Sequence, residues 1–148
     1  MTDKSFYNEL SRALFRSDAA ELLRILEVYR CWSLKSDNYP SECDEVMASA
    51  HKDPEIALAL VILAAANFDD PEFLRLMAAG TLEELLRKPS QDMLDRIIAE
   101  ARKTERFRWM LSAVYNHAIE PEDVRLAISD VVGKLSCETD PLPPRPFA

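Results

Sequence analysis

The amino-acid sequence predicts an all-α protein, on the basis of three observations. The chain of 148 residues contains only 2 glycines, whereas β-sandwiches and barrels need many tight turns in which glycine is the usual residue. Ala, Leu, Glu and Arg are abundant, and these residues have a high helix propensity. Apolar residues recur at spacings of three and four, and no segment alternates as a strand does. We therefore expect eight or nine short helices in stacked antiparallel pairs, as a HEAT-like or irregular α-solenoid array.

The first three helices are predicted over residues 3–15, 19–35 and 41–51. Asp18 followed by Glu21 resembles a capping box, so it marks the start of the second helix. Residues 36–40 have the composition of a turn. The apolar residues expected to face inward from the third helix are Val46, Met47 and Ala50.

The next helix, residues 54–67, is predicted to be the structural centre. It begins with Asp53-Pro54-Glu55, in which Asp caps, Pro occupies the first helical position and Glu lies near the positive end of the helix. The segment is apolar nearly all round, which is typical of a helix buried on several sides. The residues expected to be buried are Leu60, Val61, Leu63 and Ala64.

Two short helices are predicted over residues 73–79 and 82–88. Asp70 precedes the first helix as its cap, and Gly80 is expected to end it in the C′ position. A capping box that includes Glu84 then starts the second helix, which a proline ends.

Ser90, Thr104 and Pro121 are expected to begin the last three helices. The middle one of these should turn Phe107, Met110, Leu111, Val114 and Tyr115 inward. Residues 137–148 contain four prolines, and we expect them to form an extended, disordered tail with polyproline II character. The predicted organisation is a single helical domain over residues 1–136 followed by this tail.

Three features of the sequence indicate a cytoplasmic protein. Cys31, Cys43 and Cys137 form no C-x-x-C pair, and free thiols in a reducing compartment are the simplest interpretation. The most apolar stretch, residues 56–66, is shorter than the ~20 residues of a membrane-spanning helix. No secretory signal opens the sequence. We therefore expect no membrane partner.

The net charge of −8 is concentrated in the middle of the chain. Residues 1–35 carry a net charge of +1, residues 36–95 carry −9, and residues 96–148 carry none. Such a surface repels phosphate backbones, so nucleic acid is not an expected partner. It attracts a basic protein. The alternative is that the acidic residues only keep the protein soluble.

The sequence does not indicate a catalytic or metal site. Its two histidines are His51 and His117, and the eight-residue spacing from Cys43 to His51 lies outside the usual ligand spacings. No Gly-x-Ser-x-Gly motif or glycine-rich phosphate loop occurs. The carboxylate pairs at 69–70 and 83–84 are interpreted as helix-start residues. We expect no cofactor, no metal and no enzymatic activity.

A basic cluster stands close to the end of the helix that Ser90 begins. We expect this cluster to be solvated and to pair with the acidic middle of the chain, and a phosphate-binding patch is the alternative. Its members are Arg102, Lys103, Arg106 and Arg108.

Residues 53–114 contain a series of motifs. They are Asp53-Pro54-Glu55, an Ala-rich apolar helix over residues 58–66, the second start at Asp69-Asp70-Pro71-Glu72-Phe73-Leu74, the segment Ala79-Gly80-Thr81-Leu82-Glu83-Glu84-Leu85-Leu86, and Ala101-Arg102 with Phe107-Arg108 and Leu111. This series resembles a bacterial family of uncharacterised all-helical domains. The resemblance implies an all-helical fold and no particular activity.

These observations predict a non-enzymatic protein-interaction domain. The most specific hypothesis is a bacterial immunity or antitoxin-type protein that binds a basic partner through its acidic surface. The alternative is a regulatory or adaptor domain, and a hydrolase with an unrecognised site is a third possibility. Helix capping accounts for Asp53, Asp70 and Glu84. The carboxylates left free to contact a partner are Glu42, Glu45, Asp69, Glu83 and Asp92.

Overall fold

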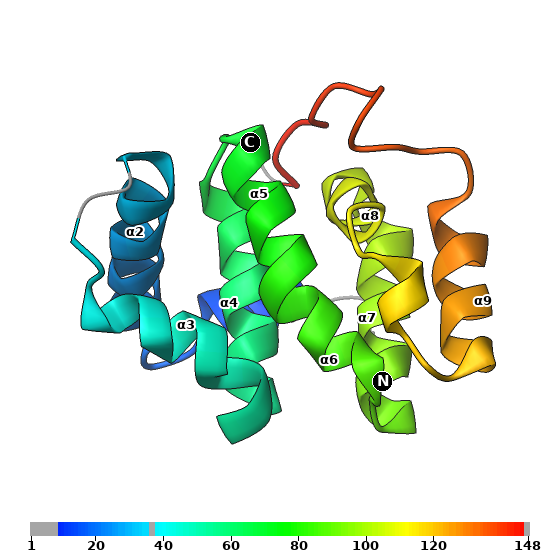
Figure 1. Cartoon of the computed structure of the whole chain (residues 1–148), viewed down its shortest axis with the longest axis horizontal. Coiled ribbons are helices and arrows are strands. Elements are labelled where there is room, and N and C mark those ends of the chain that lie inside the picture. Colours follow the sequence, from blue (N-terminus) through cyan, green and yellow to red (C-terminus); the bar gives the residue numbers. More distant parts are fainter. Residues whose placement is uncertain (1–8, 36–37, 147–148) are drawn as a thin grey trace, which may run out of the picture.

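A computed structural model, which describes residues 9–35 and 38–146, confirms the all-α fold (Figure 1). These residues form no strand. The predicted start of the first helix, residues 3–8, lies outside them. The helices are α1 (Glu9–Leu14), α2 (Ala19–Lys35), α3 (Ser41–Lys52), α4 (Pro54–Asn67), α5 (Pro71–Met77), α6 (Glu83–Arg87), α7 (Gln91–Lys103), α8 (Glu105–Leu111) and α9 (Glu122–Val132), with a π-helical turn at Ala78–Leu82 and a 3₁₀ turn at Asn116–Ala118.

The helices form an array that runs from α2 at one end to α9 at the other, with α4 near its centre (Figure 1). Helix α4 contacts the helices that precede it in the sequence, α1, α2 and α3. It also contacts the later helices α5, α6 and α8. In a solenoid each repeat contacts only its neighbours. A HEAT-like repeat is therefore not confirmed, because one helix serves as the common centre of the packing.

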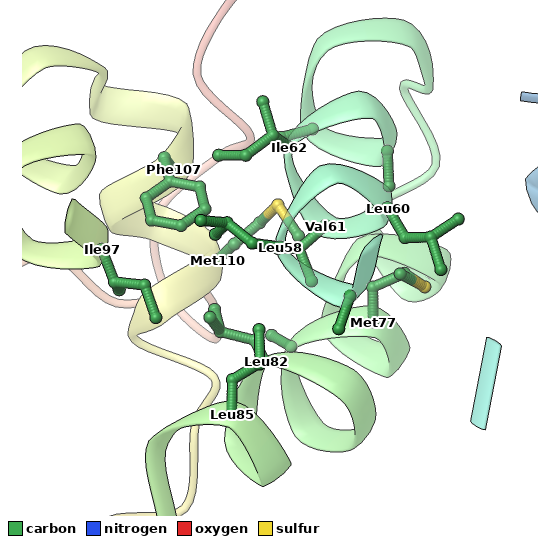
Figure 2. Packing of buried hydrophobic residues seen from close by; sticks show 14 of the residues in the cluster. Leu58, Leu60, Val61, Ile62, Met77, Leu82, Leu85, Ile97, Phe107 and Met110 are labelled. Atoms are coloured by element: carbon green, nitrogen blue, oxygen red, sulfur yellow. The ribbon is translucent and has the colours of Figure 1, made fainter. Parts of the chain in front are cut away.

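The prediction that α4 is the structural centre is confirmed. Leu60 is 1% exposed, and Val61, Leu63 and Ala64 are completely buried. Side chains from α5, α6, α7 and α8 surround the helix, including Met77, Leu85, Ile97 and Phe107 (Figure 2). Because apolar partners lie on all its sides, the helix needs no polar face.

Two of the predicted helix caps are confirmed. The Asp53 carboxylate accepts hydrogen bonds from the backbone N–H groups of Glu55 (3.1 Å) and Ile56 (3.5 Å). The Ser90 hydroxyl oxygen accepts from the N–H of Met93 at 3.1 Å. Both residues thus satisfy backbone donors that the first turn of a helix leaves unpaired.

Three other predicted caps are wrong, because each side chain has a different partner. The Asp70 carboxylate accepts from Arg30 at 3.3 Å and makes no capping bond. The Thr104 hydroxyl donates back to the Glu100 carbonyl at 3.1 Å and makes no capping bond either. Glu84 lies within continuous helix and caps nothing.

The predicted break at Gly80 is also wrong. Helix α5, the π-helical turn and α6 follow one another without interruption from Pro71 to Arg87. Met77, Ala78 and Leu82 are buried on either side of the glycine, so core packing continues through it. A π-helical turn accommodates an extra residue within a helix. A positive φ, which favours glycine, occurs instead at Gly133, where α9 ends with φ 60° and ψ −125°.

Met47 and Tyr115 do not face inward as predicted, since they are 45% and 62% exposed. For Tyr115 the cause is that α8 ends at Leu111, so the helical spacing stops before it reaches the tyrosine. Met47 lies on the outer side of α3, whose buried residues are Cys43, Val46 and Ser49.

Residues 137–146, which we call the strap, are ordered, so the expectation of a disordered tail is wrong for them. The strap leaves α9 and runs back over α8 towards α5 (Figure 1). Cys137 and Pro143 are buried, and Leu142 packs against the core. None of the described helices combines the length and the apolar character needed to cross a membrane.

Candidate functional site

The five carboxylates predicted to contact a partner do not form one site. Glu42 and Glu45 lie on α3, and Asp92 lies in the first turn of α7. Glu42 pairs with Arg24 at 3.0 Å, and Asp92, whose side chain is 79% exposed, lies 3.5 Å from Arg96. Glu45 is exposed and makes no ion pair within the described ranges. Of these three, Glu45 alone therefore keeps an uncompensated charge.

Asp69 and Glu83 are not free, so the prediction is wrong for both. Asp69 accepts from Arg106 at 3.0 Å and from Arg145 at 2.7 Å. The hydrogen bond from Arg145 has the larger effect, and together the two bonds lower the pKa of Asp69 to about 2. Glu83 is buried, and its carboxylate accepts from the backbone N–H of Tyr115 at 2.9 Å.

Arginines from outside the acidic middle of the chain neutralise much of its charge. Arg24 and Arg30 on α2 pair with Glu42 and Asp70. Further arginines come from α7, α8 and the strap, namely Arg96, Arg106 and Arg145. The net charge of −9 that the sequence assigns to residues 36–95 therefore does not appear as a free acidic face. Its main partners are other parts of the same chain.

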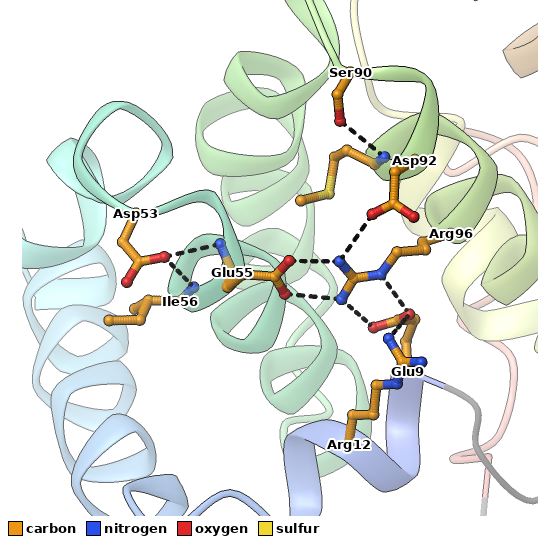
Figure 3. A network of polar contacts seen from close by, with 9 residues as sticks. Glu9, Arg12, Asp53, Glu55, Ile56, Ser90, Asp92 and Arg96 are labelled. Carbon is orange, nitrogen blue, oxygen red and sulfur yellow. Dashed lines mark hydrogen bonds and ion pairs between the residues drawn. The ribbon is translucent and has the colours of Figure 1, made fainter.

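The Arg96 network shows this neutralisation most clearly (Figure 3). The guanidinium of Arg96 donates to Glu9 at 2.7 and 3.0 Å and to Glu55 at 2.5 and 2.8 Å. The hydrogen bonds from Arg96 lower the pKa of Glu55. The network joins the N-terminal ends of α1 and α4 to α7.

The basic cluster predicted near residue 104 does not form a patch. Helix α7 ends at Lys103, so Arg102 and Arg106 lie on different helices. Arg106 is only 5% exposed, and its partners include Asp69, as expected of a residue that pairs with the acidic middle. Arg108 donates to the Ala101 and Arg102 carbonyls, at the end of α7.

The helical domain carries an open cleft of about 580 Å³. It lies where the C-terminal ends of α3 and α6 meet the beginning of α7 and the 3₁₀ turn. Leu85 and Met93 contribute apolar surface to it. The charged residues in its lining are Glu84, Arg87, Lys88 and Glu120, and His51 lies beside them.

The charges of the cleft are paired with one another. His51 Nε2 lies 3.2 Å from Glu84 Oε2, and Arg87 Nε lies 3.3 Å from Glu84 Oε1. Lys88 Nζ lies 3.3 Å from Glu120 Oε2. Ser90 also lines the cleft, but its hydroxyl is engaged as the cap of α7. Within these pairs no nucleophilic side chain contacts a base.

A strip of exposed side chains continues from the cleft along α3. Tyr39 and Met47 are 47% and 45% exposed, and the Tyr39 hydroxyl lies 3.1 Å from the Met47 sulfur. The same hydroxyl donates to Asp44 at 2.9 Å, which raises the pKa of Tyr39 to about 12. His51 follows Met47 by four residues and therefore shares its face of the helix. We call Tyr39, Asp44 and Met47 the α3 strip.

Sequence reasoning missed both the cleft and the strip. It considered His51, whose side chain is 73% exposed, only as a metal ligand and gave no reason to connect it with Glu84 or Arg87. Met47 was the available signal on α3, and it was interpreted as core. The described residues contain no group of three or more side chains that could hold a metal ion.

The fold and the site together define an all-α domain with an open cleft bordered by paired charges. Residues 34–134 match the Family of unknown function (DUF6869), so the chain belongs to this family. No curated protein and no solved structure matches the chain. The family match includes the whole lining of the cleft and the α3 strip, and it excludes α1, nearly all of α2 and the strap.

Proposed function

We propose that this protein is a non-enzymatic protein-interaction domain whose partner docks on the cleft and the α3 strip. The carrying observation is that the lining of the cleft falls entirely within the family match. The other cavities described each include residues outside the match, such as Glu9, Pro146 or Glu27. The cleft is thus the cavity that belongs to the family region alone.

The chemistry of the surface supports a protein partner. Apolar side chains line the cleft and the strip, and charged pairs surround them, which is the usual composition of an interface core with a polar rim. Asp44 and Glu45 have no cationic partner among the described side chains. A basic partner would therefore meet Glu45, one of the five carboxylates that the sequence suggested, together with Asp44, which the sequence did not single out.

Two biological roles are compatible with this surface. In an immunity or antitoxin role the partner is a basic toxin, whereas in a regulatory or adaptor role it is another protein of the host cell. Both use the same docking face, so the identity of the partner distinguishes them. Co-purification with the products of neighbouring genes, followed by a toxicity assay of each product, separates the two roles.

Point variants test the docking face. Met47→Asp should weaken binding of an isolated partner at least ten-fold, because it places a charge in the apolar part of the interface. Leu126→Asp is the matched control, since Leu126 is 61% exposed but lies on α9. Titration calorimetry gives both affinities. Equal affinities for the two variants would exclude the α3 strip as the docking face.

The hydrolase alternative predicts a different result for the same cleft. It requires the His51–Glu84 pair to act as a base and its orienting carboxylate. Turnover of an ester, phosphoester or peptide substrate by the parent, lost in His51→Ala, would replace the binding proposal with an enzymatic one.

A further inference from the structure

The strap is held through its backbone by side chains of the helical domain. Arg75 Nε donates to the Cys137 carbonyl at 3.3 Å, and Trp109 Nε1 donates to the Asp140 carbonyl at 2.9 Å. Arg106 Nε donates to the Pro143 carbonyl at 2.9 Å. The accepting carbonyls are thus three residues apart along the chain. Residues 137–139 form a turn that is closed by a hydrogen bond from the Asp140 N–H to the Ser136 carbonyl at 2.8 Å, and residues 141–145, which include three of the four prolines, have no regular secondary structure.

The donors and acceptors on the two sides are complementary. Arginine and tryptophan side chains can only donate hydrogen bonds. Residues 138–146 contain four prolines, which have a carbonyl acceptor but no N–H donor. A proline-rich segment can therefore satisfy this surface without burying an unpaired N–H. Arg75 also stacks over the Trp109 ring at 5.5 Å, so the two donors support one another.

One side-chain contact adds selectivity to these backbone contacts. Arg145 binds Asp69 with two hydrogen bonds, of 2.9 and 2.7 Å. Asp69 is fixed in turn by Arg106, the residue that binds the Pro143 carbonyl. Arg106 binds the carbonyl of Pro143, and Asp69 binds the side chain of Arg145, two residues later. The surface therefore recognises a proline followed two residues later by an arginine.

The surface and the strap belong to different parts of the chain. Asp69, Arg75, Arg106 and Trp109, which we call the strap surface, lie within the residues that match the family, whereas the strap follows the last matched residue. The surface is thus part of the family region, and a segment outside the matched residues fills it.

We propose that the strap surface is a recognition site for extended, proline-rich protein segments that carry an arginine, and that the strap occupies it as an internal competitor. The occupant in trans is a partner segment with the pattern of residues 138–146. Binding in trans must compete with a strap whose effective concentration is of millimolar order, as for short flexible tethers. The parent protein should therefore bind such a segment weakly, and weakening the strap should expose the site.

The test uses a fluorescent synthetic peptide of residues 138–146 and the full-length protein. Arg145→Glu weakens the strap by placing a carboxylate beside Asp69, and leaves the strap surface unchanged. Fluorescence anisotropy should show at least ten-fold tighter peptide binding to Arg145→Glu than to the parent. Lys134→Glu is the matched control, since Lys134 is exposed and lies before the strap, and it should behave like the parent.

Two further variants test whether the peptide uses the predicted contacts. A peptide in which its own arginine is replaced by glutamate should not bind either protein. Trp109→Phe, introduced with Arg145→Glu, removes the donor to the Asp140 carbonyl and should weaken binding of the unaltered peptide about five- to ten-fold, the effect of one net hydrogen bond. Binding that is independent of the peptide's arginine would overturn the proposal.

Thiol labelling of the parent gives a readout that does not depend on a variant. Cys137 begins the strap and is 6% exposed, whereas Cys43 is completely buried in the core and burial raises the pKa of its thiol. Excess peptide should accelerate labelling of Cys137, followed by mass spectrometry, and leave Cys43 unchanged. If neither labelling of Cys137 nor anisotropy with folded Arg145→Glu responds to the peptide, the proposal is wrong.

Discussion

The two ends of α4 are each held by an arginine, but in different ways. At the N-terminal end Arg96 binds the carboxylates of Glu9 and Glu55 and is itself partly exposed. At the C-terminal end Arg106 is buried and donates directly to the carbonyls of Ala65 (3.0 Å) and Phe68 (2.7 Å). Both arrangements suit the helix dipole, which favours anions at the N-terminus and cations at the C-terminus.

The two arginines differ in the groups that would lose their hydrogen-bond partner if each arginine were removed. The last carbonyls of a helix have no partner within it, and the carbonyl of Ala65 is surrounded by core. Water cannot easily replace Arg106 there. Of the two carboxylates that Arg96 binds most closely, Glu55 has a side chain 55% exposed, and Glu9 is buried but has a second cationic partner in Arg12 at 3.4 Å. We therefore expect the C-terminal end of α4 to be much more sensitive to substitution.

The largest effect is expected from Arg106→Met. This substitution fills a similar volume but leaves the Ala65, Phe68 and Pro143 carbonyls without their donor, so it should cost about 3–5 kcal/mol of unfolding free energy. Such a loss is a large share of a typical total stability of about 5–15 kcal/mol. Urea denaturation measures it. Arg108→Met is the control, because Arg108 is half-buried and binds carbonyls only at the end of α7.

A smaller effect is expected from the same substitution at the other end of α4. Arg96→Met should cost about 1–2 kcal/mol, because Glu55 regains water when the ion pairs are lost and the buried Glu9 keeps its pair with Arg12. The loss should also shrink in 1 M salt, which screens partly exposed charges, while that of Arg106→Met should not. Equal losses for the two variants at both salt concentrations would contradict the proposed difference between the ends of α4.

The C-terminal end of α4 also lies near a buried acid, Glu100, which is 3% exposed. Its Oε2 atom has no hydrogen-bond partner within the part of the chain that the structure describes. A cavity of about 10 Å³, lined by Glu100, Arg106 and Pro146 among others, is only about the size of one water molecule. Burial raises the pKa of Glu100, and the charge of Glu9 acts in the same direction.

This raised pKa predicts a dependence of stability on pH. Between the ordinary pKa of a glutamate and the raised value, the folded state holds a proton that the unfolded state has lost, so stability falls as pH rises through this range. Glu100→Gln should remove that fall and gain about 1 kcal/mol over the parent at pH 8, but nothing at pH 4. Thermal melts at the two pH values test this. The same gain at both values would show that ionisation is not the cause.

The sequence predicts those parts of the fold that depend on neighbouring residues. Asp53 caps α4 through the N–H groups of the residues two and three positions later. The burial of Leu60 follows from the apolar residues around it in the sequence. The helical turn through Gly80 could not be predicted, because distant core contacts outweigh the local preference of a glycine. Propensity and capping signals are weak compared with tertiary packing.

The site was harder to predict than the fold, because its residues meet only after folding. Arg96 and Glu9 are 87 positions apart, and Arg145 and Asp69 are 76 apart. Net charge along the sequence could not show that these residues neutralise each other. The cleft likewise combines residues from α3, α6, α7 and the 3₁₀ turn, so no local sequence motif predicts it.

The smallest effect on stability is expected at a charge that neither end of α4 uses. Glu45 is exposed and unpaired among the described residues, so Glu45→Lys should change Tm by no more than about 2 °C. It should nevertheless slow association with a basic partner at low salt, because exposed interface charges act mainly on the association rate. Asp130→Lys is the matched control, since Asp130 is exposed on α9. Stopped-flow association at two ionic strengths gives both rates. The two variants change the net charge equally. A slower rate only for Glu45→Lys would therefore locate the basic partner on α3, and identical rates would show that the partner does not associate at α3.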